Sequence, residues 1–382
     1  VGNIGTGRIE IVIVRVDFAV LDAAGVAPRP FMAVCGGIER MLADTTADRA
    51  DAFLPLVVFV RIFRLTAAAP FAVVSCVIAP ILHIPDIRCP LGMRVPVIIA
   101  VFVAADLADR TADTGRLAAG MREQLSALQK DYGVDGFKFD GGGAQFYLPA
   151  QEASGRSAAD FTAAWFDFAA QYAYNEVKDT WKAGGKPLNQ RLRDKTHAWD
   201  GEGLSCILPD AFNAALTGHP FLCPDMVGGG EWTNFEPGHV IDQELIVRCA
   251  QVSALFPMMQ FSVAPWRVLS PENGARVLRA AKLHQAMGEK LWQWVQQSAR
   301  TGEPILAPMA YAFPGCGMEE IADQFVLPDG TIVAPVLQKG ALQRTVRLPE
   351  GNWQDESGAH FAGGEVTVPV DPDRLPRFFR IG

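Results

Sequence analysis

The spacing of apolar positions along the chain changes near residue 115. Ahead of this point, apolar positions form unbroken runs, typical of strands buried on both faces of a parallel sheet, at 54–60, 71–82 and 95–105. From residue 116 on, apolar positions recur at helical spacing and predict helices at 117–131, 158–182, 204–216, 241–253 and 271–299. Short apolar runs between these helices predict a strand that ends at Asp140 and further strands at 187–193, 220–224 and 255–263. This alternation predicts an α/β fold of βαβ units, in the form of a (β/α)8 TIM-type barrel.

The last part of the chain has a different pattern. Short apolar segments separated by Gly and Pro turns predict strands at 304–312, 324–327, 331–336, 343–348 and 365–370. They predict a C-terminal antiparallel β-sandwich domain that follows the barrel. The expected domains are therefore an atypical segment at 1–115, a catalytic barrel portion at 116–300 and a β-sandwich at 301–382.

The segment 1–115 is atypical in composition. No Lys, Trp or Tyr stands before Lys130. One interpretation is that this segment is read out of frame or comes from a misjoined gene. The other is an unusual α/β segment that forms a degenerate start of the barrel, which would be incomplete if these strands were absent.

Composition excludes several classes of function. A net charge of −8 argues against a surface that binds nucleic acid or anionic lipid. The seven cysteines contain no CxxC pair and the six histidines no metal-binding spacing, so we expect reduced thiols, a cytoplasmic location and neither metal nor cofactor. The uncharged stretch 65–85 holds three prolines and is better explained by a soluble protein than by a membrane span. Homo-oligomerisation is left open.

Polar groups follow each of the four predicted strands after residue 130. Asp140 precedes three glycines, Asp194 follows the strand at 187–193, Asp225 precedes Gly228–Gly230, and Trp266 follows the fourth strand. In a barrel these ends share one rim, where catalytic groups of such enzymes lie. Two alternatives remain at this point: Asp140 caps the next helix, and Asp194 is an ion-pair partner of its cationic neighbours.

Two carboxylates across a cleft are what cleavage of a glycosidic bond requires. One protonates the leaving oxygen, and the other attacks the anomeric carbon or activates a water molecule. Trp199, Trp232 and Trp266 offer flat apolar faces on which sugar C–H groups can pack, although each one is by itself more often a core residue.

Four motifs in order resemble glycoside hydrolase family 31, the family of retaining α-glucosidases and related α-glycosidases. They are GVDGFKFDGG at 133–142, DKTHAWD at 194–200, HPFLCPDMVGG at 219–229 and MQFSVAPW at 259–266. The resemblance, closest to the branch that includes α-galactosidases, covers 116–382. It implies Asp140 as nucleophile and Asp194 as general acid/base, with an oligosaccharide or small α-glycoside as partner. The substrate-binding residues that it implies are Lys138, Arg191, Trp199, Asp225 and Trp266.

The resemblance implies hydrolysis with retention of configuration and no metal or cofactor. Asp194 must be protonated for the first step, so its pKa should be raised by burial or by a nearby carboxylate. The cations Arg191, Arg193 and Lys195 act in the opposite direction. Lys138, two residues before the nucleophile, favours an α-galactoside over an α-glucoside. The alternative function is a catalytically impaired family remnant that binds carbohydrate or regulates another protein.

Overall fold

The computed structural model describes residues 13–18, 56–62, 97–103, 114–148, 155–230, 235 and 238–381. The chain forms two compact units, Val1–Lys182 and Ala183–Gly382, which are considered separately. The domain ranges expected from the sequence stay a prediction.

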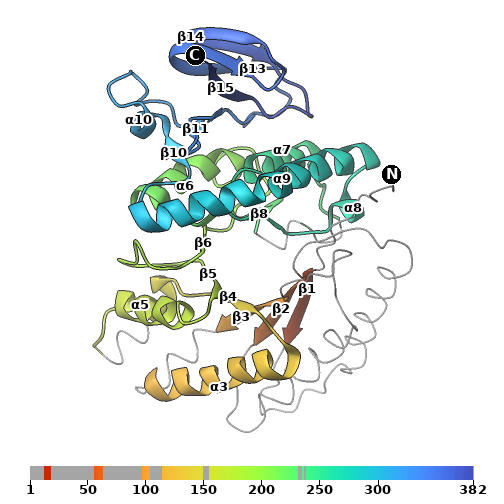
Figure 1. Ribbon diagram of the computed structural model, residues 1–382. Coiled ribbons are helices and arrows are strands. Elements are labelled where there is room, and N and C mark those ends of the chain that lie inside the picture. Colours follow the sequence, from red (N-terminus) through yellow and green to blue (C-terminus); the bar gives the residue numbers. More distant parts are fainter. Residues whose placement is uncertain are drawn as a thin grey trace, which may run out of the picture. The chain divides into compact units, whose positions relative to one another are not determined.

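The first unit contains parallel strands in chain order (Figure 1). Each strand pairs with the next: β1 (Ile13–Phe18), β2 (Leu56–Ile62), β3 (Val97–Val103), β4 (Gly136–Asp140) and β5 (Tyr174–Val177). Helix α3 (Thr114–Tyr132) connects β3 to β4. Strands β2 and β3 confirm the runs at 54–60 and 95–105, whereas β1 was not predicted and the run at 71–82 lies outside the described residues. Three parallel strands thus precede the one that carries Asp140.

The predicted long helix at 158–182 is wrong in its second half. Helix α5 (Ala158–Ala169) begins with a capping box between Ser157 and Asp160, and the chain then turns into β5. The reason is long-range, because β5 supplies backbone hydrogen-bond partners to the buried strand β4, which would otherwise lack them on this edge.

The second unit begins with short strands and long helices. β6 (Gln190–Arg191) pairs in parallel with β7 (Leu222–Cys223), and β8 (Met226–Val227) with β9 (Gln260–Phe261). The helices are η3 (Leu204–Cys206), α6 (Ile207–Leu216), α7 (Gln243–Ser253), α8 (Pro265–Val268) and α9 (Pro271–Thr301). They confirm the helices predicted at 204–216, 241–253 and 271–299. Gly302, at φ 78°, ends α9 in the left-handed conformation that favours glycine.

The C-terminal strands form one six-stranded sheet, and its pairs are antiparallel, as predicted. The order is β10 (Ala307–Pro308), β11 (Phe325–Val326), β12 (Ile332–Val333), β15 (Arg377–Ile381), β13 (Gln343–Asp355) and β14 (His360–Pro369). Trp353 and Phe378 are fully buried in its core. The predicted strand at 304–312 is wrong beyond Pro308, where α10 (Met309–Ala312) follows, and β15 was not predicted.

Helices α7 and α9 lie side by side in Figure 1 and make specific contacts with the C-terminal sheet and its loops. The buried side chain of Arg248 donates to the carbonyl oxygen of Arg374 at 3.1 Å, and Gln251 donates to that of Pro372 at 2.9 Å. The rings of Phe256 and Phe325 lie edge to face at 6.2 Å. The helices and the sheet therefore share a buried polar and aromatic boundary.

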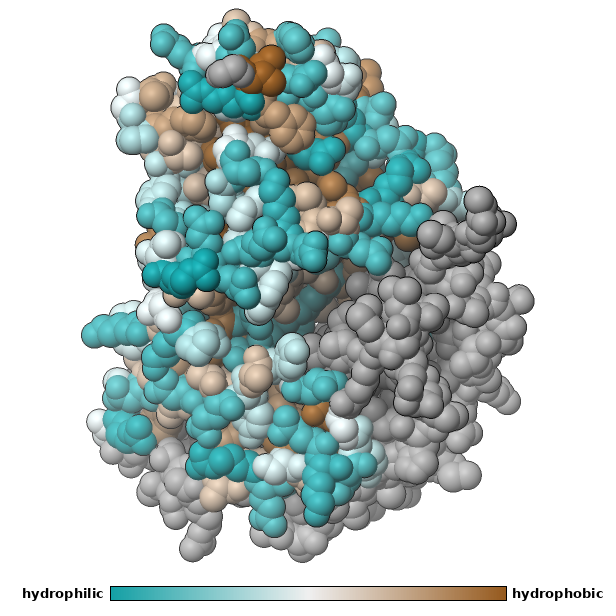
Figure 2. All heavy atoms as spheres, viewed as in Figure 1, coloured by the Kyte–Doolittle hydropathy of each residue, from teal (hydrophilic) through white to brown (hydrophobic). Residues whose placement is uncertain are grey.

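The described surface is mixed in character. On the face that Figure 2 shows, hydrophilic and hydrophobic residues are interspersed over the described residues. None of the helices within the described ranges combines the length and the apolar character that crossing a bilayer needs.

The buried carboxylate of Asp355 in β13 makes the stability of this sheet depend on pH. Burial alone would raise its pKa, but hydrogen bonds from Ser357 and Ala359 and the charge of Arg374, 2.6 Å away, hold the pKa below its ordinary value of 3.8. Because the pKa is depressed in the folded state, the stabilisation is complete above 3.8 and is lost as pH falls through the folded value.

We expect Asp355→Asn to lower the free energy of unfolding by about 1–3 kcal/mol near neutral pH, since it leaves buried donors without their charged partner. Urea unfolding of the two proteins should show this difference shrinking in acid. A difference that grows as pH falls would contradict the prediction.

Candidate active site

Asp140 is the last residue of β4. Phe137 and Phe139 point to one face of this strand, where Phe139 packs edge to face on Trp165 of α5 at 5.6 Å, so Lys138 and Asp140 share the other face. The chain turns sharply afterwards: Gly141 has a φ of 78°, and a Cβ at Gly142 would lie 2.1 Å from the Trp165 ring. The turn therefore requires Gly141, and close packing against Trp165 requires Gly142.

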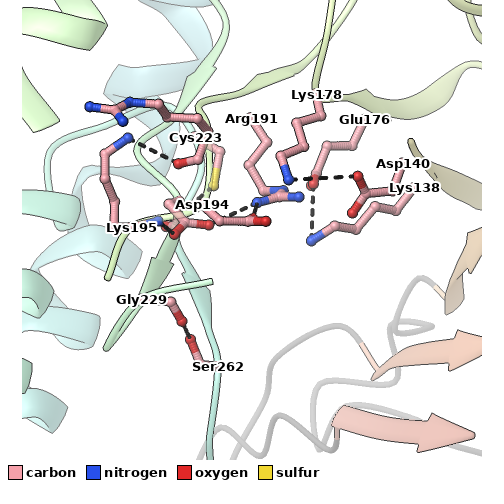
Figure 3. Close-up of polar contacts among 12 residues, drawn as sticks. Lys138, Asp140, Glu176, Lys178, Arg191, Asp194, Lys195, Cys223, Gly229 and Ser262 are labelled. Carbon is pink, nitrogen blue, oxygen red and sulfur yellow. Dashed lines mark hydrogen bonds and ion pairs between the residues drawn. The ribbon is translucent and has the colours of Figure 1, made fainter. Parts of the chain in front are cut away.

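The carboxylate of Asp140 is held by its own turn and by a lysine. Its Oδ1 accepts the N–H of Gly141 at 2.8 Å and lies 3.9 Å from Nζ of Lys178 (Figure 3). Within the described residues, Gly141 opens a turn and the short helix η2 (Ala144–Tyr147) has Gly143 as its N-cap, so Asp140 does not cap the helix that follows. A partly buried carboxylate at the end of a strand is a group that can act as a nucleophile.

Lys138 is neutralised by a neighbouring strand. Its Nζ lies 3.1 Å from Oε1 of Glu176, its register partner in β5, and both side chains are buried (Figure 3). Its predicted contact with substrate stays a prediction. Neither Glu176 nor Lys178 was singled out in the sequence, because only the pairing of β4 with β5 brings them here.

In the second unit, Arg191 lies at the centre of a polar cluster that it forms with Asp194 and Asp225. The side chain is buried at the end of β6, and its Nη1 donates to Oδ1 of Asp194 at 2.6 Å and to Oδ1 of Asp225 at 2.8 Å (Figure 3). The side chain of Asp194 is 36% exposed, whereas that of Asp225 is 1% exposed. The two aspartates predicted from separate motifs thus meet on one guanidinium.

Asp225 adopts an unusual backbone conformation, with a φ of 97°. A non-glycine residue in this region stores about 1–3 kcal/mol of strain, and Asp tolerates it better than most residues. Its Oδ2 accepts the backbone N–H of Lys195 at 2.8 Å. Burial raises the pKa of the Asp225 carboxyl, while the charge of Arg191 and the N–H of Lys195 act in the opposite direction. The side chain of Asp225 therefore links its own loop to the loop that contains Lys195.

The cations beside Asp194 have other partners. Arg193 pairs with Glu202 at 2.7 Å and with Asp210 at 2.9 Å, and the buried Nζ of Lys195 pairs with Asp210 at 2.9 Å. Burial alone would raise the pKa of Asp210, but hydrogen bonds from Lys195 and Arg193 hold it below its ordinary range. The expected ion pair of Asp194 is thus made with Arg191.

Gly229 and Gly230 lie in close contact with the loop that carries Asp194 and Lys195. A Cβ at Gly229, whose φ is 100°, would lie 2.5 Å from the carbonyl oxygen of Lys195, and a Cβ at Gly230 would lie 2.5 Å from Oδ1 of Asp194. Ser262 donates its hydroxyl to the carbonyl oxygen of Gly229 (Figure 3). These glycines allow close approach of two loops.

We expect Gly230→Ala to lower kcat/KM on an α-glycoside roughly 10²-fold, because the new methyl group displaces the Asp194 carboxyl by a fraction of an ångström or more. Gly288→Ala in α9 is the matched control, since nothing lies within 4 Å of its Cβ. Steady-state kinetics compare the two, and equal activities would contradict the prediction.

Trp199 belongs to a second polar group built around Asp242. Its indole N–H donates to Oδ2 of Asp242 at 2.9 Å, and Lys339 approaches the same oxygen at 2.7 Å. His197 accepts the backbone N–H of Asp242 through Nε2, which leaves Nδ1 to donate to the carbonyl oxygen of Gly228. Asp242 was missed in the sequence, although its position as N-cap of α7 is a recognisable signal.

The other two tryptophans singled out in the sequence are Trp266 and Trp232. Trp266 lies on α8 and is 49% exposed, so its ring is available to a ligand. Trp232 lies outside the described residues. Within the parts of the chain that the structure describes, no three His, Cys, Asp or Glu side chains gather in a way that could hold a metal ion.

The predicted site residues therefore fall into two groups. Lys138 and Asp140 belong to the first unit, and Arg191, Asp194, Trp199, Asp225 and Trp266 to the second. The separation of Asp140 from Asp194, which would distinguish retention from inversion, stays a prediction.

A curated protein and a family model each match part of the chain. The myogenesis-regulating glycosidase of Mus musculus is 30% identical over 271 residues, which are 66% of this chain and 37% of the mouse protein. Residues 302–382 match the family model described as glycosyl hydrolase family 31 C-terminal domain. The chain therefore carries the C-terminal domain of glycosyl hydrolase family 31 and is similar to a glycosidase over 66% of its length. The resemblance drawn from the four motifs is thereby confirmed.

A second curated protein is similar over a comparable share of the chain. The sulfoquinovosidase of Escherichia coli (strain K12) is 28% identical over 289 residues, covering 69% of this chain and 41% of that protein. The chain thus spans well under half the length of these family relatives.

Solved structures agree in fold. A family 31 sulfoquinovosidase from E. rectale has a TM-score of 0.65 at 13% identity, covering 98% of this chain and 62% of that one. The cycloalternan-degrading enzyme from Trueperella pyogenes has a TM-score of 0.59 at 20% identity, covering 91% and 51%. At these identities the likeness shows the fold alone.

Proposed function

We propose that this chain hydrolyses α-glycosidic bonds with retention of configuration, with Asp140 as nucleophile and Asp194 as general acid/base. The observation that carries the proposal is the cluster in which Arg191 holds the motif aspartates Asp194 and Asp225 together. Its family relatives support the reaction class, since they include proteins named α-glucosidase, sulfoquinovosidase and isomaltosidase.

The proposed fold of the active protein is a (β/α)8 barrel followed by the antiparallel C-terminal domain. The parallel strands β1–β5 and the parallel pairs of the second unit support it, as does the likeness to solved family structures. Asp140 is the last residue of β4 and Asp194 follows β6, the strand ends where such barrels carry their catalytic groups.

The reaction has two steps. Asp140 attacks the anomeric carbon while Asp194 donates its proton to the departing oxygen, and a covalent β-glycosyl-enzyme forms. Asp194 then takes a proton from water, which attacks the same carbon and releases the sugar in its α configuration. The reaction requires the two carboxyl groups to come within about 5–5.5 Å of each other.

We propose an α-galactoside as the preferred substrate, on the basis of Lys138. Since Lys138 is buried against Glu176, it would act by shaping the pocket beside Asp140 and not by carrying a free charge to the sugar. The solved relative from Trueperella pyogenes is described in complex with isomaltose, which supports an oligosaccharide as an alternative substrate class.

The test is hydrolysis of 4-nitrophenyl α-galactoside, α-glucoside and α-sulfoquinovoside, followed by proton NMR of the sugar released. We expect turnover, fastest for the galactoside, with the α anomer appearing first. Appearance of the β anomer first would refute retention. Binding of these sugars without any turnover above that of an Asp140→Asn, Asp194→Asn double variant would show a carbohydrate-binding remnant instead.

A further inference from the structure

Asp225 is a motif residue whose carboxylate is fully occupied by the protein. Oδ1 accepts from Nη1 of Arg191 at 2.8 Å and Oδ2 accepts from the N–H of Lys195 at 2.8 Å, and the side chain is 1% exposed. At this exposure a sugar hydroxyl has almost no access to either oxygen. The geometry therefore favours a role toward the protein over direct contact with substrate.

Two of the donors that hold Asp225, Arg191 and the N–H of Lys195, are also connected to Asp194. Arg191 gives the same Nη1 to Oδ1 of Asp194, and Lys195 is the next residue along the chain. The carbonyl oxygen of Lys195 in turn accepts the N–H of Gly230 at 3.1 Å. Asp225 thus fixes both the guanidinium beside Asp194 and the backbone that carries Asp194.

Arg191 is a cation that pairs directly with Asp194, at 2.6 Å. On its own loop, Arg193 and Lys195 are neutralised by Glu202 and Asp210. From α7, the pKa of the buried Cys249 thiol is raised to about 12 by burial, so this group is neutral. His197 is held between the carbonyl of Gly228 and the N–H of Asp242, and Asp242 pairs with Lys339.

Arg191 lies between the two carboxyls, so Asp194 and Asp225 share the charge of its guanidinium. Asp225 meets N–H donors at both oxygens, an arrangement that suits its ionised form. Asp194 is the more exposed of the two and can exchange a proton with solvent, as a general acid must.

We propose that Asp225 is a positioning residue that keeps Asp194 able to act as an acid, by taking up the charge of Arg191 and by fixing the Asp194 loop through the Lys195 N–H. The inference rests on the proposed glycosidase function. It also explains how an acid can work beside Arg191, which would otherwise favour the ionised form of Asp194.

The experiment is the pH dependence of kcat/KM for Asp225→Asn on the best aryl α-glycoside. Asn keeps the size of Asp and tolerates a positive φ, but it removes the negative charge. We expect the basic limb, which reports the acid in the free enzyme, to move about one pH unit toward acid, because the negative charge of Asp225 that offsets Arg191 beside Asp194 is then removed. kcat should fall more than KM rises.

Asp355→Asn is the matched control. Asp355 is also a buried carboxylate with an arginine partner, but it lies in β13 of the C-terminal sheet. This variant should lose stability and leave the pH profile unmoved. Thermal melts of both variants separate loss of folded protein from loss of catalysis.

A direct titration supplements the kinetics. In protein labelled with 13C at the aspartate carboxyl carbons, the resonance lost in Asp194→Asn identifies Asp194. We expect its midpoint to fall by about one pH unit in Asp225→Asn. An unmoved midpoint would overturn the inference.

The kinetic outcomes are also distinct. A basic limb that stays in place, with KM raised and kcat unchanged, would make Asp225 a substrate ligand and overturn the inference while leaving the glycosidase function intact. A wild-type chain that turns over no α-glycoside would overturn both.

Discussion

Replacing Asp140 by Asn is expected to reduce kcat/KM on an aryl α-glycoside by at least about 10⁴-fold, because the amide cannot form the glycosyl ester. Asp140 stands at the end of β4 with its Oδ1 held by the Gly141 N–H, and Asn can keep that hydrogen bond. Folding should therefore be preserved, and the loss should appear in steady-state kinetics at unchanged melting temperature.

A chemical rescue makes this prediction specific to the nucleophile. Asp140→Gly with added azide should form the β-glycosyl azide, whereas Asp194→Ala with azide should form the α-glycosyl azide. Asp131→Asn, an exposed aspartate on α3 of the same unit, is the control and should keep full activity. Substantial residual activity in Asp140→Asn would refute the assignment.

Arg191→Ala should be the most destabilising single substitution in the second unit's site. It leaves the buried Asp225 and the partly buried Asp194 without their shared cation, and removal of one partner from a buried ion pair costs about 3–5 kcal/mol. Urea unfolding near neutral pH measures this loss. The loss should lessen in acid, since protonation removes the unpaired charge.

Two further variants test the cause. Arg279→Ala, which breaks a surface pair with Asp373, should cost no more than about 1 kcal/mol. Arg191→Lys should recover only part of the loss, because an ammonium group does not match the fixed geometry of a guanidinium. A loss in Arg191→Ala as small as that in Arg279→Ala would show that the cluster contributes little to stability.

Local pattern was enough to predict the features that depend on neighbours in sequence. The apolar positions before Asp140 and the glycines after it predicted a buried strand that ends on this carboxylate, and β4 is that strand. Helices α7 and α9 were found because the apolar stripe of each lies within a single window of sequence.

Features set by distant residues could not be predicted in the same way. The strand β5 was taken as helix because its partner β4 lies more than 30 residues earlier, and a run of aromatic residues satisfies both patterns. β1 contains Arg15 and Asp17, which interrupt the apolar signal. The ion pair between Arg191 and Asp225 joins the end of β6 to a loop 34 residues later in the chain. The sequence shows both charged residues but not that they lie close together.

The boundary between α7, α9 and the C-terminal sheet has a consequence for how this protein can be cut or recombined. Arg248 and Gln251 find their acceptors on the backbone near Arg374, and Lys339 reaches Asp242, which also binds Trp199. An expression fragment that stops at Gly302 would strip these buried donors of their acceptors. In a chimera between family members, the sheet, α7 and α9 should therefore all come from the same parent protein.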